Sequence, residues 1–68
     1  MRRSLCLILT TEHPTDRALT STVRLTPADF VAAHPALADA ARRVLRTGAT
    51  EAFAQPSGGA LYIARGVA

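Results

Sequence analysis

The segment Glu12-His13-Pro14-Thr15-Asp16 places two carboxylates beside a histidine that can act as a base near neutral pH. A histidine with a carboxylate partner is the minimum requirement for general base catalysis, so a hydrolase built from this chain would depend on His13. The same residues are typical of a solvated loop, and neither a nucleophile motif nor an oxyanion donor can be assigned beside them. We therefore expect a non-enzymatic protein, and a small hydrolase using His13 is the third alternative.

Metal and cofactor sites have little support in the sequence. His13, His34 and the single cysteine, Cys6, fall short of the ligand spacings that mark zinc sites. Cys6 lies inside an apolar run, where a cysteine behaves as a small hydrophobe. Ser57 stands in Pro-Ser-Gly-Gly, which is neither a nucleophile elbow nor a phosphate loop, and a hairpin turn explains it. We expect no metal and no cofactor.

Three arginines fall on one face of a predicted helix and form a compact positive patch: Arg42, Arg43 and Arg46. Such a patch could bind phosphate groups or an acidic protein surface. Arg2 and Arg3 could extend it if the first strand lies beside this helix.

The arginine patch also has a structural explanation. Basic residues near a helix C-terminus interact favourably with the helix dipole, by about 0.3–1 kcal/mol each. Asp39 can also pair with Arg42 or Arg43 across one turn. The sequence has no interleaved aromatic residues, no RNA-binding sheet motif and no convincing helix-turn-helix. A small nucleic-acid-binding or toxin–antitoxin-type regulator that uses this helix face is therefore the alternative function.

Two strands are expected before the first helix. Residues 4–11 hold a continuous apolar run, as in a strand that is covered on both faces, and residues 12–17 form a polar loop. Residues 19–25 alternate as a half-buried strand does. One face of this second strand consists of Leu19, Ser21, Val23 and Leu25.

Two helices are expected next. Thr26 can cap a helix whose first position is Pro27, and His34-Pro35 ends it after about two turns. A second helix is predicted from Pro35 to about Thr47, followed by Gly48 as its stop. Its apolar stripe consists of Leu37, Ala41, Val44 and Leu45, and its polar face of Asp39, Arg42, Arg43 and Arg46.

Residues 49–55 and 60–65 predict two further strands around the turn at residues 56–59. The order β-β-α-α-β-β predicts a small α+β domain with a four-stranded, mainly antiparallel sheet and both helices packed on one face. The first and last strands are apolar on both faces. If they are central neighbours, the open face carries an apolar interface that includes Ile8 and Tyr62, unless loops cover it.

Composition limits the class of protein. A chain of 68 residues is long enough for one domain, residues 1–68, and 49% hydrophobic residues exclude a disordered tail. The net charge is +3, and all eight basic residues are arginine. Arginine without lysine, beside abundant alanine, indicates a bacterium or phage with a GC-rich genome. The lone cysteine excludes a disulfide within the chain.

The N-terminal apolar run of about five residues is shorter than the 7–15 of a secretory signal, and no run approaches the ~20 of a membrane span. We therefore expect a cytoplasmic protein. The leading hypothesis is a small protein-interaction module, such as an inhibitor, an adaptor or a small subunit. It would dock a partner protein, or a second copy of itself as a homodimer, through a sheet face, a strand edge or the arginine helix.

Overall fold

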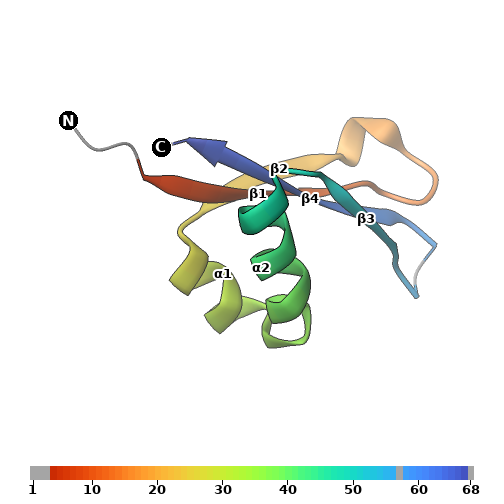
Figure 1. Ribbon diagram of the computed structural model, residues 1–68. Coiled ribbons are helices and arrows are strands. Elements are labelled where there is room, and N and C mark those ends of the chain that lie inside the picture. The colour runs from red at the N-terminus through yellow and green to blue at the C-terminus, as the bar shows by residue number, and fades with distance from the viewer. Residues whose placement is uncertain (1–3, 57, 68) are drawn as a thin grey trace.

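The computed structural model describes residues 4–56 and 58–67, and of Arg17 only the backbone. Four antiparallel strands form one sheet in the order β2-β1-β4-β3, and two helices lie below one of its faces (Figure 1). The strands are β1 (Leu5–Thr11), β2 (Ser21–Leu25), β3 (Glu51–Ala54) and β4 (Ala60–Val67), and the helices are α1 (Pro27–Ala33) and α2 (Ala38–Thr47). The predicted fold class, element order and one-sided placement of the helices are confirmed.

The two central strands, β1 and β4, carry the core. They pair antiparallel from Leu5 opposite Val67 to Thr11 opposite Leu61. Because side chains alternate along a strand, one face of this pair presents Leu7, Leu9 and Ile63 to the helices. These three side chains are buried against Phe30 of α1 and Val44 of α2, and the core continues into Ala40 and Ala41. The continuous apolar run of the sequence therefore forms β1, one of the two strands that have a neighbouring strand on each side.

The prediction that residues 19–25 form a half-buried strand is wrong in two respects. The strand begins only at Ser21, because Arg17–Leu19 forms a 3-10 turn in which the Asp16 carboxylate accepts a hydrogen bond from the Ala18 N–H. The strand is also exposed along Ser21–Arg24, and only Leu25 is partly buried. β2 lies at an edge of the sheet, and the two helices do not cover it.

Helix α1 begins and ends where the sequence predicts. The Thr26 hydroxyl accepts a hydrogen bond from the Asp29 N–H at 3.1 Å, and Pro27 occupies the first helical position. The His34 N–H donates the last helical hydrogen bond, to the Phe30 carbonyl at 2.8 Å. At His34 the backbone leaves helical geometry, with φ −133° and ψ 66°, as expected for a residue before proline.

The predicted start of the second helix at Pro35 is three residues too early. Residues Pro35–Leu37 form a 3-10 turn, in which the Leu37 N–H donates to the His34 carbonyl, and α2 begins at Ala38. The helix ends at Gly48, as predicted. There φ is 77°, which favours glycine, and the Gly48 N–H donates to the Val44 carbonyl.

The last two strands are unequal in length. β3 is shorter than the predicted 49–55, whereas β4 runs beyond the predicted 65 to Val67. The Gln55 N–H donates to the Gly59 carbonyl, and the Gly58 N–H to the Gln55 carbonyl, so a turn closes the hairpin as expected. Ser57 lies outside the described residues.

Neither helix in the described ranges is long and apolar enough to cross a membrane.

The substitution Phe30→Ala tests the one-sided core. Phe30 is fully buried between the sheet and α2, so its truncation should lower the free energy of unfolding by about 3–5 kcal/mol. Urea unfolding followed by circular dichroism measures the loss. Phe30→Leu is the matched control and should cost clearly less. A loss below about 1 kcal/mol for Phe30→Ala would show that the core does not depend on this ring.

Candidate interaction surfaces

The loop around His13 uses its polar side chains to hold its own backbone. His13 Nδ1 accepts hydrogen bonds from the Asp16 N–H at 3.1 Å and from the Thr15 N–H at 3.3 Å. All three residues are exposed. The acceptor nitrogen of the imidazole and one Asp16 carboxylate oxygen, which accepts from Ala18, are therefore both engaged in the loop. In this arrangement His13 holds the backbone of its own loop. No hydrogen bond among the described residues joins its imidazole to a carboxylate.

The other candidate sites of the sequence lie apart. His34 closes α1 and lies with its ring 5.3 Å from that of Phe30, whereas His13 lies in the loop between β1 and β2. Cys6 is buried. Among residues 4–56 and 58–67, no three acidic, histidine or cysteine side chains gather as metal ligands, and no pocket opens in the surface.

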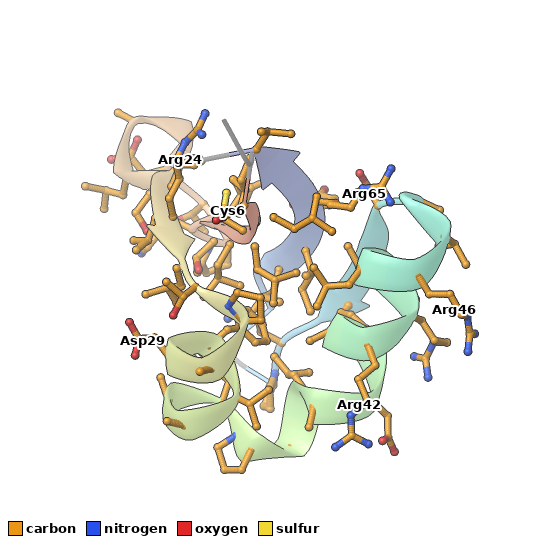
Figure 2. The ribbon with its side chains drawn as sticks, turned by 60° about the vertical axis from the view of Figure 1, so that its left-hand side comes forward. Cys6, Arg24, Asp29, Arg42, Arg46 and Arg65 are labelled. Carbon is orange, nitrogen blue, oxygen red and sulfur yellow. The ribbon has the colours of Figure 1, made fainter. Side chains whose placement is uncertain are left out.

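The three arginines of α2 are exposed, as predicted, but they are not equivalent. Arg42 and Arg46 project into solvent from one side of the molecule (Figure 2). Arg42 reaches the Asp39 carboxylate at 3.5 Å, in a pair whose side chains are 75% and 87% exposed. Arg46 has no hydrogen bond or ion pair with any described residue. Arg2 and Arg3, which could have extended the patch, lie outside the described residues.

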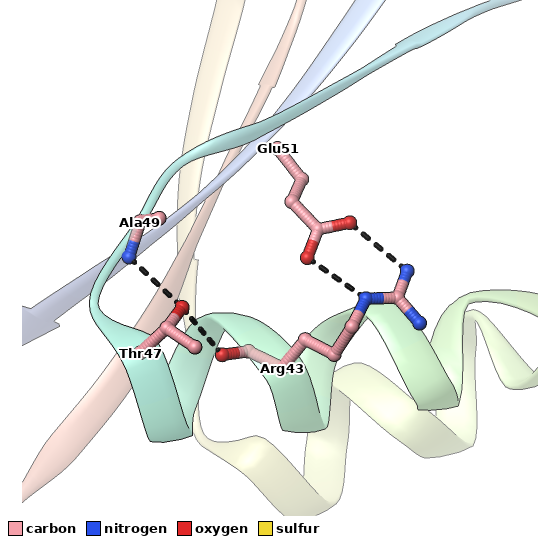
Figure 3. Close-up of polar contacts among 4 residues, drawn as sticks. All are labelled: Arg43, Thr47, Ala49 and Glu51. Atoms are coloured by element: carbon pink, nitrogen blue, oxygen red, sulfur yellow. Dashed lines mark hydrogen bonds and ion pairs between the residues drawn. The ribbon is translucent and has the colours of Figure 1, made fainter.

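Arg43 joins α2 to β3. Its Nε and Nη2 donate to the two carboxylate oxygens of Glu51 at 3.0 and 2.9 Å (Figure 3). The hydrogen bond and the charge of Arg43 lower the pKa of the Glu51 carboxyl, and those of Glu51 raise the pKa of Arg43. Thr47 strengthens the same corner, because its hydroxyl donates to the Arg43 carbonyl and accepts from the Ala49 N–H.

The pairing of Arg43 weakens the patch as an anion site. Arg42 pairs with Asp39 and Arg43 with Glu51. The three arginines and two carboxylates together therefore carry a local excess of one positive charge. Two further arginines are also engaged in the fold. Arg65 Nη1 donates to the Leu45 carbonyl at the C-terminal end of α2, at 3.1 Å, and Arg24 Nη1 donates to the Val67 carbonyl at 3.4 Å. The positive charge is thus spread over the molecule (Figure 2).

Within residues 4–56 and 58–67, no helix lies over the face of the sheet opposite α1 and α2 (Figure 1). We call it the helix-free face, and the strand register places on it Cys6, Ile8, Thr10, Thr22, Arg24, Ala52, Tyr62, Ala64 and Gly66. β1 and β4 are central neighbours, so Ile8 and Tyr62 belong to one surface, two residue pairs apart. This is the condition under which the sequence predicts an apolar patch.

At one end of the helix-free face, the absence of a side chain at one glycine leaves room for its neighbours. Gly66 lies opposite Cys6, and the side chains of Cys6 and Ile8 lean over it. A Cβ at Gly66 would come within 2.8 Å of Ile8 Cδ1 and 3.0 Å of Cys6 Sγ. Cys6 is consequently only 5% exposed although no helix covers it. Ile8, Tyr62 and Ala64 remain half-buried at the surface.

Tyr62 contributes a polar group to this apolar area. A hydrogen bond to Glu12, together with the charge of that carboxylate, raises the pKa of the Tyr62 phenol. Glu12 follows β1, and its N–H donates to the Ala60 carbonyl, so it lies beside Tyr62 at the end of the face. The sequence indicated the tyrosine but not this partner. Alternation along residues 8, 10 and 12 places Glu12 on the same face as Ile8, but its position beside Tyr62 depends on the register of β1 with β4.

Phenolate titration tests the Glu12–Tyr62 contact. Tyr62 is the only tyrosine and the chain has no tryptophan, so ultraviolet difference absorbance reports on this one phenol. We expect its midpoint above the ordinary value of 10.0, because the neighbouring carboxylate disfavours the phenolate. Glu12→Gln should move the midpoint back toward that value, whereas Glu51→Gln, on the other face, should not. Equal midpoints for wild type and Glu12→Gln would contradict the contact.

The Arg43–Glu51 pair predicts acid sensitivity. Because the folded-state pKa of Glu51 lies below its ordinary value of 4.5, the pair stabilises the fold above about that pH. The contribution is lost as the pH falls through the lowered folded-state pKa. Urea midpoints of wild type and Glu51→Gln should therefore differ at neutral pH and converge in acid. Asp39→Asn, which removes the longer and more exposed pair, is the control and should change the midpoint less. If the urea midpoints of wild type and Glu51→Gln still differed at low pH, the difference could not come from the ionised Arg43–Glu51 pair.

Comparison with known protein families, with curated proteins and with solved structures finds no match. The function of this chain therefore has to be inferred from its surfaces.

Proposed function

We propose that this protein is a non-enzymatic interaction module of the cytoplasm, which docks a partner protein through the helix-free face of its sheet. The observation that carries the proposal is the composition of this face. Its centre presents Ile8, Tyr62 and Ala64, and no helix or strand of the described residues lies over it. Uncovered apolar areas of this kind on small proteins mark interaction surfaces.

The distribution of side chains over the face resembles an interface. Ile8, Ala64 and Tyr62 lie on β1 and β4, with Thr10 between β2 and Tyr62. Thr22 and Glu12 lie beside them, and the Arg24 guanidinium reaches across β1 to the Val67 carbonyl. An apolar centre with a polar rim is the usual anatomy of a protein–protein contact. Tyr62 combines a large apolar ring with a hydroxyl, and tyrosine is among the residues that contribute most to binding energy.

The shape of the face argues for a macromolecular partner. The described part of the surface has no pocket, and small molecules bind in concave sites that enclose most of their surface. A flat sheet face instead fits a flat apolar surface of another protein. An inhibitor, an adaptor and a small subunit all act through such a contact.

The arginine face of α2 supports the alternative, a nucleic-acid-binding or toxin–antitoxin-type regulator, less well. Arg43 is held by Glu51, and Asp39 lies beside Arg42. Arg46 is the remaining arginine of this face, and a single cation cannot replace the several phosphate contacts from which nucleic-acid affinity arises. This alternative remains an outcome of the experiment below.

A tagged pull-down from native cytosol, read by mass spectrometry with and without nuclease, tests the proposal. We expect a stoichiometric protein whose capture survives nuclease and washes with about 0.5 M salt, because salt screens charge interactions and has little such effect on an apolar contact. Ile8→Glu and Tyr62→Glu should each abolish its capture by burying a charge in the interface. Ala32→Glu introduces the same charge on the exposed side of α1 and should leave capture unchanged. Circular dichroism verifies that every variant is folded.

Two results would contradict the proposal. Capture that survives Ile8→Glu and Tyr62→Glu in folded protein would exclude the helix-free face. Prey that disappears with nuclease, and with the double variant Arg42→Ala/Arg46→Ala, would favour the nucleic-acid alternative.

A further inference from the structure

The two edges of the sheet differ in their protection. Edge β3 has only four residues, and its first, Glu51, is tied to α2 by Arg43. Edge β2 has five residues, of which four are exposed, and Val23 at its centre is 47% exposed. Among the described residues, no segment pairs with the outer side of β2.

Edge β2 also lacks the features by which proteins prevent strand pairing. It contains no proline, and its register with β1 is regular from Leu25 opposite Leu7 to Ser21 opposite Thr11, without a bulge. Its one charged residue, Arg24, directs its guanidinium across β1 to the Val67 carbonyl and therefore away from the edge. An open, regular and partly apolar edge is a template for another strand.

We propose that a second copy of this chain pairs antiparallel along β2, with a two-fold axis at Val23, so that two four-stranded sheets become one of eight strands. This pairing uses the backbone hydrogen-bonding groups along the outer side of β2, whereas the docking proposed above uses side chains of the helix-free face, and it therefore goes beyond that docking function.

The register around Val23 is self-complementary. A two-fold axis there places Val23 opposite Val23 of the second copy, where the two side chains can pack on each other as a cross-strand pair. Thr22 faces Arg24 of the second copy, so the two arginines do not oppose each other. All five residues of β2 are paired.

The same register accounts for a second exposed apolar side chain. Leu19, in the 3-10 turn before β2, is 59% exposed. The axis at Val23 brings the start of β2, which Leu19 precedes by two residues, opposite the end of β2 of the second copy, which Pro27 follows by two residues. Leu19 and Val23 are two of the four large apolar side chains that are exposed among the described residues, and one symmetric contact would cover both.

The size of the protein favours self-association. A chain of this length buries only about 60% of the surface that its unfolded form exposes, and such small domains often gain stability from a partner. A second copy is present at the same concentration as the first and needs no further gene product. A closed two-fold pairing also removes the open edge and so prevents further addition along β2.

Cysteine cross-linking in a Cys6→Ala background tests this register. Paired residues across two strands have Cα atoms about 4.5–5.5 Å apart, within the range of a disulfide, whereas diagonal residues lie beyond it. Val23→Cys alone should therefore form a covalent dimer under mild oxidation. Thr22→Cys and Arg24→Cys should each form no covalent dimer alone but cross-link when mixed. Non-reducing electrophoresis and intact mass spectrometry identify the products.

Sedimentation of the protein without added cysteines provides the second measurement. Wild type should approach twice 7.2 kDa as its concentration rises, and Val23→Lys should remain at the monomer mass because two lysines would face each other at the axis. Val23→Thr is the conservative control and should still dimerise, as should Ile8→Glu, which alters only the helix-free face. Loss of docking in Ile8→Glu with dimerisation intact separates the two proposals.

Three results would overturn the β2 pairing. One is a wild-type mass of 7.2 kDa at every concentration together with no cross-link from Val23→Cys. The second is a dimer that survives Val23→Lys, and the third is efficient cross-linking of Thr22→Cys with itself, which requires another register.

Discussion

The pairing of β1 with β4 at the centre of the sheet is the constraint on which the rest of the structure depends. It aligns Leu7, Leu9 and Ile63 on one face, where Phe30 and Val44 pack on them. A chain of 68 residues has apolar residues for one such layer only, because surface is large relative to volume at this size. Both helices are therefore used on one side, and the other face and the β2 edge are left without a helix.

Three of the five arginines whose side chains are described hold separate elements of the fold together. Arg43 joins α2 to β3, Arg65 donates to a carbonyl at the C-terminal end of α2, and Arg24 reaches across the central strand to β4. The contacts of Arg65 and Arg24 connect segments 20 and 43 residues apart, and that of Arg43 connects a helix to the strand that follows it. A guanidinium group suits this task because it offers several donors on a long stem whose methylenes can pack on apolar surface. A positive net charge is thus compatible with a protein that does not bind phosphate.

The helix-free face and the β2 edge arise from the same limit but present different chemistry. The face offers side chains, among them an isoleucine and a tyrosine, and the Ile8 and Cys6 side chains pack closely on Gly66. The edge offers backbone donors and acceptors together with Val23. A partner can therefore recognise the face by shape and apolar contact, whereas pairing along the edge depends on register. The two contacts are geometrically compatible, since pairing along β2 extends the helix-free face sideways.

The type and order of the elements follow from local signals in the sequence: the apolar run of β1, the Thr26 cap with Pro27, the break at His34-Pro35 and the stop at Gly48. Alternation along the strands also predicted that Ile8 and Tyr62 would share the open face if β1 and β4 were central neighbours, and the strand order of the folded chain meets that condition. The tertiary structure was needed to show that β2 is an exposed edge, that Arg43 pairs with Glu51, and that Glu12 lies beside Tyr62. The β2 position and the Arg43–Glu51 pair depend on strand order and helix placement, and all three arise from long-range packing, which the period of a sequence does not encode.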